Sequence, residues 1–202
     1  MLDLVRSLAG LELSPESYLE DFWPHFREVK DVLWKLERIQ DFREPDEPSW
    51  LAMTEGDWER ALALIEKKRG ESQQQAKSSE GFANRRLRIV EQPVTPYLQW
   101  EMHILKIRVE TGEQEIKVLD AHAVRQLEAQ QPLPELLVLG TSALYEVLYD
   151  ETGVLSGARR IDDLKVIDAC RQELAELFDE GEDLLAYFER EIEPLPRPNI
   201  SN

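Results

Sequence analysis

The chain has 202 residues, of which 42% are hydrophobic and 32% are charged, and its formal net charge is −17. This composition excludes a disordered chain and predicts a globular protein that buries a sizeable core. No apolar stretch approaches the roughly 18 residues of a membrane span, and the N-terminus lacks the basic start and apolar run of a signal peptide. A single cysteine, Cys170, excludes an internal disulfide, so we expect a cytoplasmic protein that does not bind membranes.

The negative charge is concentrated at the two ends of the chain. Residues 1–60 and 161–202 each carry a net charge of −8, whereas residues 61–160 carry −1. Direct nucleic-acid binding is disfavoured, because phosphate contacts need clustered Lys and Arg side chains. The acidity serves either solubility or an acidic face that meets a basic partner.

In the first part of the chain, the patterns predict two helices and one strand. Ser14-Pro15-Glu16 is typical of a helix start, and the alternation over 32–37 predicts a strand. The prolines and acids of 41–48 indicate a loop, and a second helix is expected to open at Glu55-Gly56-Asp57. Residues 71–83 offer few apolar side chains, so they are predicted to form a mobile loop or a frayed helix end.

The central part contains the clearest strand-to-helix pattern. Residues 85–91 alternate as a strand, and Thr95 followed by Pro96 is typical of an N-cap and first helical position. A strand over 115–120 follows, and a short helix is expected over 121–130.

The last part is predicted to contain three strands and then helices. Runs at 135–140, 144–149 and 154–161 are joined by turn residues, which favours an antiparallel meander. Asp162-Asp163 is expected to cap a long helix, which Gly181 ends before a second short helix.

This order predicts an α/β (α+β) fold with a mixed sheet of about five to six strands. An N-terminal βαβ part is followed by the antiparallel meander, and helices flank the sheet. We expect a single domain over residues 1–192 and a C-terminal tail over residues 193–202.

Motifs of common enzyme classes are missing from the sequence. It has no glycine-rich phosphate loop, no G-x-S-x-G elbow and no zinc-ligand spacing around its three histidines. Cys170 lies on the apolar stripe of its helix, where a core position is expected. We therefore expect no catalytic residues, no metal and no cofactor.

One stretch, residues 85–101, nevertheless combines charged and aromatic side chains with a favourable position. A strand end that meets a helix N-terminus is a usual place for an anionic ligand in α/β folds. The candidate ligand-binding residues are Arg86, Arg88, Tyr97, Trp100 and Glu101.

The alternative is that this stretch only holds the fold together. Arg88 would then belong to a buried ion-pair network with Glu37, Glu91 or Glu101 that joins the strand to the helix. Under either interpretation, the proline turn between strand and helix predicts that Arg88 and Glu101 lie close together.

Residues 87–101, read as Leu-Arg-Ile-Val-Glu-Gln-Pro-Val-Thr-Pro-Tyr-Leu-Gln-Trp-Glu, resemble the central motif of an uncharacterised, mainly actinobacterial family. That motif is R-x-R-V-V-S-E-P-L-S-D-Y-L-R-F-E, and this chain departs from it by placing Glu91 one position before the usual acid. Residues 115–119 and 148–153 with Gly157 are similar to later strands of the family, so the resemblance covers roughly residues 30–175. Members are often encoded beside helix-turn-helix regulators, which implies an accessory role.

These observations lead to two functional hypotheses. The first is a non-enzymatic regulatory or partner-binding accessory protein whose acidic ends meet a basic protein, such as a helix-turn-helix DNA-binding regulator. The alternative is a small-anion or nucleotide sensor, or a degenerate enzyme, that uses Arg86, Arg88, Tyr97 and Glu101.

Overall fold

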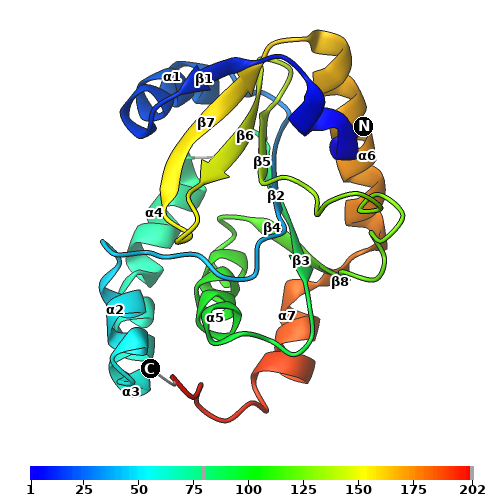
Figure 1. Cartoon of the computed structure of the whole chain (residues 1–202). Helices are drawn as coiled ribbons and strands as arrows, with labels where there is room; N and C mark the ends of the chain where they lie inside the picture. Colours follow the sequence, from blue (N-terminus) through cyan, green and yellow to red (C-terminus); the bar gives the residue numbers. More distant parts are fainter. Residues whose placement is uncertain (79–80, 201–202) are drawn as a thin grey trace.

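The computed structural model describes residues 1–78 and 81–200, which contain one mixed sheet in the order β1-β7-β6-β5-β2-β3-β4-β8 (Figure 1). The strands are β1 (Leu11–Leu13), β2 (Val32–Glu37), β3 (Ala83–Val90), β4 (Glu115–Asp120), β5 (Leu136–Leu139), β6 (Ala143–Tyr149), β7 (Leu155–Ile161) and β8 (Glu182–Asp183). The helices are η1 (Leu2–Ser7), α1 (Pro15–Arg27), α2 (Pro48–Thr54), α3 (Trp58–Lys67), α4 (Arg69–Ser78), α5 (Pro96–Glu110), α6 (Leu164–Glu180), α7 (Leu184–Tyr187) and η2 (Phe188–Ile192).

The sheet has a parallel part and an antiparallel part, as the sequence predicts. Strands β2, β3 and β4 are parallel, and α2–α4 and α5 form the two crossovers between them. Strands β5, β6 and β7 form an antiparallel meander that joins the parallel part where β5 pairs with β2. The predicted α/β class, the βαβ part and the meander are confirmed.

The predicted number of strands is wrong, because the described residues form eight rather than five to six. The two additional strands, β1 and β8, lie at opposite edges of the sheet and have three and two residues. Such short segments cannot display an alternating pattern, so their pairing depends on the neighbouring strands β7 and β4.

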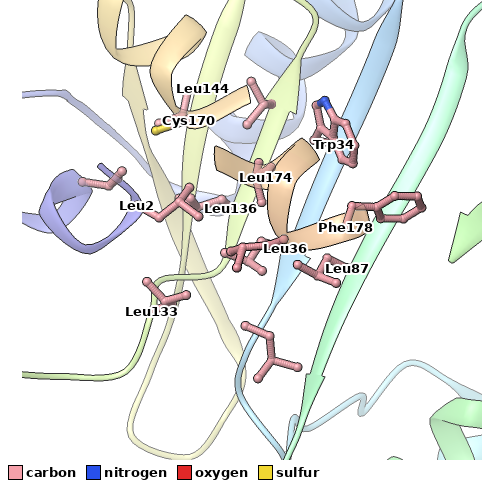
Figure 2. Close-up of a cluster of buried hydrophobic side chains, with 14 of the residues drawn as sticks. Leu2, Trp34, Leu36, Leu87, Leu133, Leu136, Leu144, Cys170, Leu174 and Phe178 are labelled. Carbon is pink, nitrogen blue, oxygen red and sulfur yellow. The ribbon is translucent and has the colours of Figure 1, made fainter. Parts of the chain in front are cut away.

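One face of the sheet is covered by α6 and η1. Alternate residues of β2 and β3, among them Trp34, Leu36 and Leu87, point to this face and pack against Leu174 and Phe178 of α6 (Figure 2). Cys170 is fully buried in the same cluster, which confirms its predicted core position. Burial also raises the pKa of the Cys170 thiol to about 12, so it is a poor nucleophile.

The opposite face carries apolar side chains at both sides and charged ones in the middle. Helix α1 packs over β5–β7, and α5 and α7 pack over β3 and β4. Between these two layers, β2 and β3 place Lys35, Glu37, Arg86 and Arg88 on the same face. The candidate site is built on this charged middle.

The helix predicted over residues 121–130 is wrong, because this segment forms successive turns. Val124 is buried in the core cluster, and the Glu128 carboxylate accepts hydrogen bonds from the Arg38 side chain at 2.6 Å and from the backbone N–H of Leu133 at 2.9 Å. These long-range contacts outweigh the local helical spacing.

The predicted loop over residues 71–83 is largely helical, because α4 extends to Ser78. Its Gln, Glu, Ala and Lys residues favour a helix even without an apolar stripe. The Ser72 hydroxyl connects α4 to the end of α5 through Thr111 Oγ1 and Glu113 Oε2, both at 2.6 Å. Residues 79–80 of this segment lie outside the described residues, and the mobility of the segment stays a prediction.

The C-terminal segment returns to the body of the protein (Figure 1). The Pro196 carbonyl accepts a hydrogen bond from the Gln99 amide at 2.9 Å, and Ile200 packs against the cluster formed by α2, α3 and α5. Among the described residues, none of the helices combines the length and apolar composition needed to cross a bilayer.

Candidate functional site

A cavity of about 550 Å³ lies over the charged middle of the sheet. Strands β2 and β3 contribute its floor, and residues of α1, α3, α4 and α5 contribute its walls. The volume falls within the range of roughly 300–1,000 Å³ that small-molecule sites occupy. We call it the central cavity.

Helix α5 supplies one complete wall of the central cavity. It begins as the sequence predicts, with Pro96 at its first position and the Thr95 hydroxyl accepting a hydrogen bond from the Leu98 N–H at 3.1 Å. Tyr97, Trp100 and Glu101 follow in the first two turns, and all three are buried and line the cavity. The Trp100 indole N–H donates to Ser49 Oγ at 3.2 Å, which fixes this ring against α2.

Arg88 and Glu101 form a buried ion pair, and their predicted proximity is confirmed. The distance from Arg88 Nε to Glu101 Oε2 is 2.8 Å, and the Tyr97 hydroxyl donates to Glu101 Oε1 at 3.5 Å. Burial and the nearby Glu37 charge raise the pKa of Glu101, although Arg88 opposes this shift. Arg88 itself has no exposed surface, so its role is to hold α5 against β3.

Glu37 is the carboxylate shared by the remaining cations. Its two oxygens contact Lys35 Nζ at 2.6 Å and Arg86 Nη1 at 2.8 Å, and Arg88 Nε lies 4.0 Å away. Burial alone would raise the pKa of Glu37, but the charges of Arg86, Lys35 and Arg88 outweigh it and lower the pKa. The central charged cluster thus pairs three cations, Lys35, Arg86 and Arg88, with two carboxylates, Glu37 and Glu101.

Arg86 is incompletely satisfied within this cluster. Its residue is only 4% exposed and it lines the central cavity, yet its Nε has no hydrogen-bond partner among residues 1–78 and 81–200. Gln114 lines the same cavity, and its buried Oε1 likewise has no hydrogen-bond partner among the described residues. Buried polar atoms are normally hydrogen-bonded, so these two atoms can bond to water or to a ligand in the cavity.

The structure brings the five predicted site residues together, but in two different roles. Arg86, Tyr97, Trp100 and Glu101 line the cavity, whereas Arg88 supports Glu101 from the protein interior. The ion pair of Arg88 with Glu101 matches the scaffold interpretation, and ligand binding by the four cavity-lining residues stays a prediction.

Glu91 does not belong to the cluster. It follows the end of β3, its side chain is 52% exposed, and it contacts Arg38 at 2.5 Å. Pairing of Arg88 with Glu91 was one of three alternatives from the sequence, and the structure selects Glu37 and Glu101 instead.

Sequence reasoning missed three basic residues of the cavity, Lys35, Lys68 and Arg108. Lys35 belongs to a strand that the alternation predicts, two positions before Glu37 and on the same face. Arg108 follows Glu101 by seven residues and so lies on the same face of α5. Helical spacing from Glu101 would have identified it.

A second cavity, of about 520 Å³, lies beside the β6–β7 turn and is lined by several acids. Its two buried carboxylates have partners within the fold. Glu135 accepts the backbone N–H groups of Arg38 and Ile39 at 2.7 and 2.6 Å, and Glu146 pairs with Arg159 at 2.6 Å. Burial and the charge of Glu37 raise the pKa of Glu135 to about 7. These contacts assign both carboxylates to the scaffold.

Comparison with known proteins gives a family but no activity. No curated protein matches the chain. A solved structure of TrmBL2, an archaeal chromatin protein with a novel mode of DNA binding, is similar over 85% of this chain with 10% identity and a TM-score of 0.44. The chain spans about half of that protein, 51% of its length.

The family assignment rests on a longer match. A family model covers residues 20–189, which include the sheet from β2 to β8, the central cavity and residues 85–101. The expectation of an uncharacterised family is confirmed by this match. The chain belongs to the family described as Domain of unknown function (DUF6879).

Proposed function

We propose that this protein is a non-enzymatic regulatory accessory protein of the cytoplasm that binds a small polar ligand in the central cavity. The observation that carries the proposal is Arg86, a buried residue that lines the 550 Å³ cavity and whose Nε has no hydrogen-bond partner within residues 1–78 and 81–200. A ligand group that accepts from this nitrogen removes the cost of leaving a buried donor unsatisfied, about 1–3 kcal/mol.

A sensing role fits the cluster better than catalysis. Glu37 and Glu101, the carboxylates nearest to Arg86 and Arg88, serve as partners of these arginines. A general base needs a group that is free to take a proton from substrate, and both carboxylates are engaged in ion pairs. The aromatic rings of Tyr97 and Trp100 supply apolar contact area for the body of a ligand.

A thermal-shift screen of small polar metabolites tests the ligand site. We expect at least one compound to raise the melting temperature of the wild type, because a ligand at one hundred times its Kd stabilises the folded state by about 2.7 kcal/mol. Arg86→Lys keeps a cation for Glu37 but lacks the Nε–H donor, so it should lose most of the shift. The matched control is Arg85→Lys on the opposite face of β3, which should respond like the wild type.

Two results of this screen contradict the proposal. The first is that no compound shifts the wild type. The second is that every active compound shifts Arg86→Lys by the same amount as the wild type.

A second role, contact with a basic protein partner, is favoured by where the acidic ends lie. Residues 1–60 and 161–202 each carry a net charge of −8. Helix η1, at the start of the first segment, packs against α6, at the start of the second (Figure 1). The Met1 amino group contacts Glu173 Oε2 at 2.8 Å at this junction. The resemblance described above suggests a helix-turn-helix regulator as the partner, contacted without direct binding of nucleic acid by this chain.

This role is tested by co-purification with a helix-turn-helix regulator of the kind that the resemblance implies. Charge-steered association should weaken steeply between low and high salt. Association that does not depend on salt, or no association at low salt, contradicts it.

A further inference from the structure

Arg108 is the least satisfied cation on the wall of the central cavity. It lies in the last turn of α5, and about one third of its side chain (34%) is exposed. Within the described residues, its guanidinium makes no hydrogen bond, and its ion pair with Glu113 Oε1 is long, at 3.8 Å. Glu113 instead accepts a hydrogen bond from the Ser72 hydroxyl at 2.6 Å, through its other oxygen.

Arg86 and Arg108 face the same cavity from different elements, β3 and α5. Burial, followed by the positive charge of Arg86, lowers the pKa of Arg108, which indicates that the two guanidinium groups repel one another. Within the part of the chain that the structure describes, each group keeps N–H donors without a protein acceptor, since Arg86 bonds Glu37 only through Nη1. Two arginines with free donors form the arrangement that binds carboxylate and phosphate groups.

In the central charged cluster, the basic side chains outnumber their carboxylate partners. Lys35 and Arg86 share the single carboxylate of Glu37, and Arg88 is matched by Glu101. Four other acids line the cavity: Glu47 pairs with Lys68, Glu113 pairs with Arg108 at 3.8 Å, and Glu44 and Glu71 have no salt bridge among the described residues. The positive charge of Lys35 and Arg86 therefore exceeds the negative charge of their shared partner.

We propose that the central cavity binds the anionic head group of a small molecule, a carboxylate or a phosphate, between Arg86 and Arg108. This inference rests on the proposed ligand-binding function and names its ligand class. It also moves the binding end of the cavity away from the helix N-terminus that the sequence indicated, toward the C-terminal turn of α5.

Isothermal titration calorimetry of the full chain with inorganic phosphate and with malonate, at constant ionic strength, tests the proposal. We expect saturable binding of at least one probe by the wild type, and the tighter probe identifies the head group as phosphate or carboxylate. Arg108→Gln should weaken this binding at least tenfold, since one of two charge-assisted contacts is lost. Arg85→Gln removes the same charge from the other face of β3 and should bind like the wild type.

Arg108→Lys controls for loss of binding through misfolding, because it keeps the charge and the aliphatic stem of the side chain. It should fold like the wild type and bind the probe more weakly than the wild type but more tightly than Arg108→Gln. Equal affinities of the wild type and both Arg108 variants overturn the proposal. Failure of both anions to bind, while a neutral metabolite binds in an Arg86-dependent manner, overturns the anion site alone and leaves the ligand-binding function standing. If no compound of any charge binds, both are wrong.

Discussion

Arg88→Ala is expected to lower the free energy of unfolding by about 3–5 kcal/mol, the largest effect of any single substitution in the central charged cluster. The substitution leaves the Glu101 carboxylate, which is buried and 2.8 Å from Arg88 Nε, without its partner. It also removes the positive charge 4.0 Å from Glu37. Urea unfolding of the wild type and the variant at neutral pH measures the difference.

Two controls separate the ion pair from other losses. Arg85 lies on the same strand, its side chain is 34% exposed, and it pairs with the exposed Glu115. Arg85→Ala should therefore lower the free energy of unfolding by less than about 1 kcal/mol. The double variant Arg88→Met with Glu101→Met replaces the whole pair by apolar side chains and should be more stable than Arg88→Ala. An Arg88→Ala protein as stable as the wild type would show that the pair does not hold α5 to β3.

Glu37→Gln is expected to cost about 3 kcal/mol near neutral pH, because Arg86 and Lys35 lose the one carboxylate that they share. The amide can still accept hydrogen bonds, so the loss measures charge rather than packing. Glu91→Gln is the matched control, since Glu91 is exposed and outside the cavity. We expect Glu91→Gln to change stability by less than about 1 kcal/mol.

The pH dependence of this variant gives a second check. The pKa of Glu37 in the folded state lies below its ordinary value of 4.5, so its charge stabilises the fold above that pH. This contribution is lost as the pH falls through the folded-state pKa. The stability gap between the wild type and Glu37→Gln should therefore be full near neutral pH and close progressively at acidic pH. A gap that is constant with pH contradicts the assignment of Glu37 as an ionised partner.

The fold could be predicted wherever one strand or helix carries its own pattern. Strands β2, β3 and β4 each show a two-residue alternation in the sequence. Thr95 and Pro96 mark the start of α5, and Asp163 marks the start of α6. Strands β1 and β8 could not be predicted, because they form only as short edges on β7 and β4. The turns of residues 121–130 were missed for a similar reason, since Val124 and Glu128 are held by distant partners.

The candidate site shows the same limit. Arg88 and Glu101 are joined by one proline turn, so their contact follows from the local chain path. Glu37 pairs with Arg86 from a separate strand, and Arg108 reaches the cavity from the far end of α5. These positions depend on the parallel register of β2 and β3 and on the crossing of α5 over the sheet, which no local pattern specifies.

The most direct test of the ligand site is the side-chain nitrogen NMR signal of Arg86. In ¹H–¹⁵N spectra that resolve arginine Nε–H groups, the Arg86 signal can be assigned by its loss in Arg86→Lys. Titration with the compound or anion that binds best should shift this signal with the same Kd that calorimetry gives, because the ligand accepts a hydrogen bond from Nε. The Arg85 signal, on the other face of β3, should stay in place. An Arg86 Nε–H signal that does not move at saturation would contradict ligand binding at the central cavity.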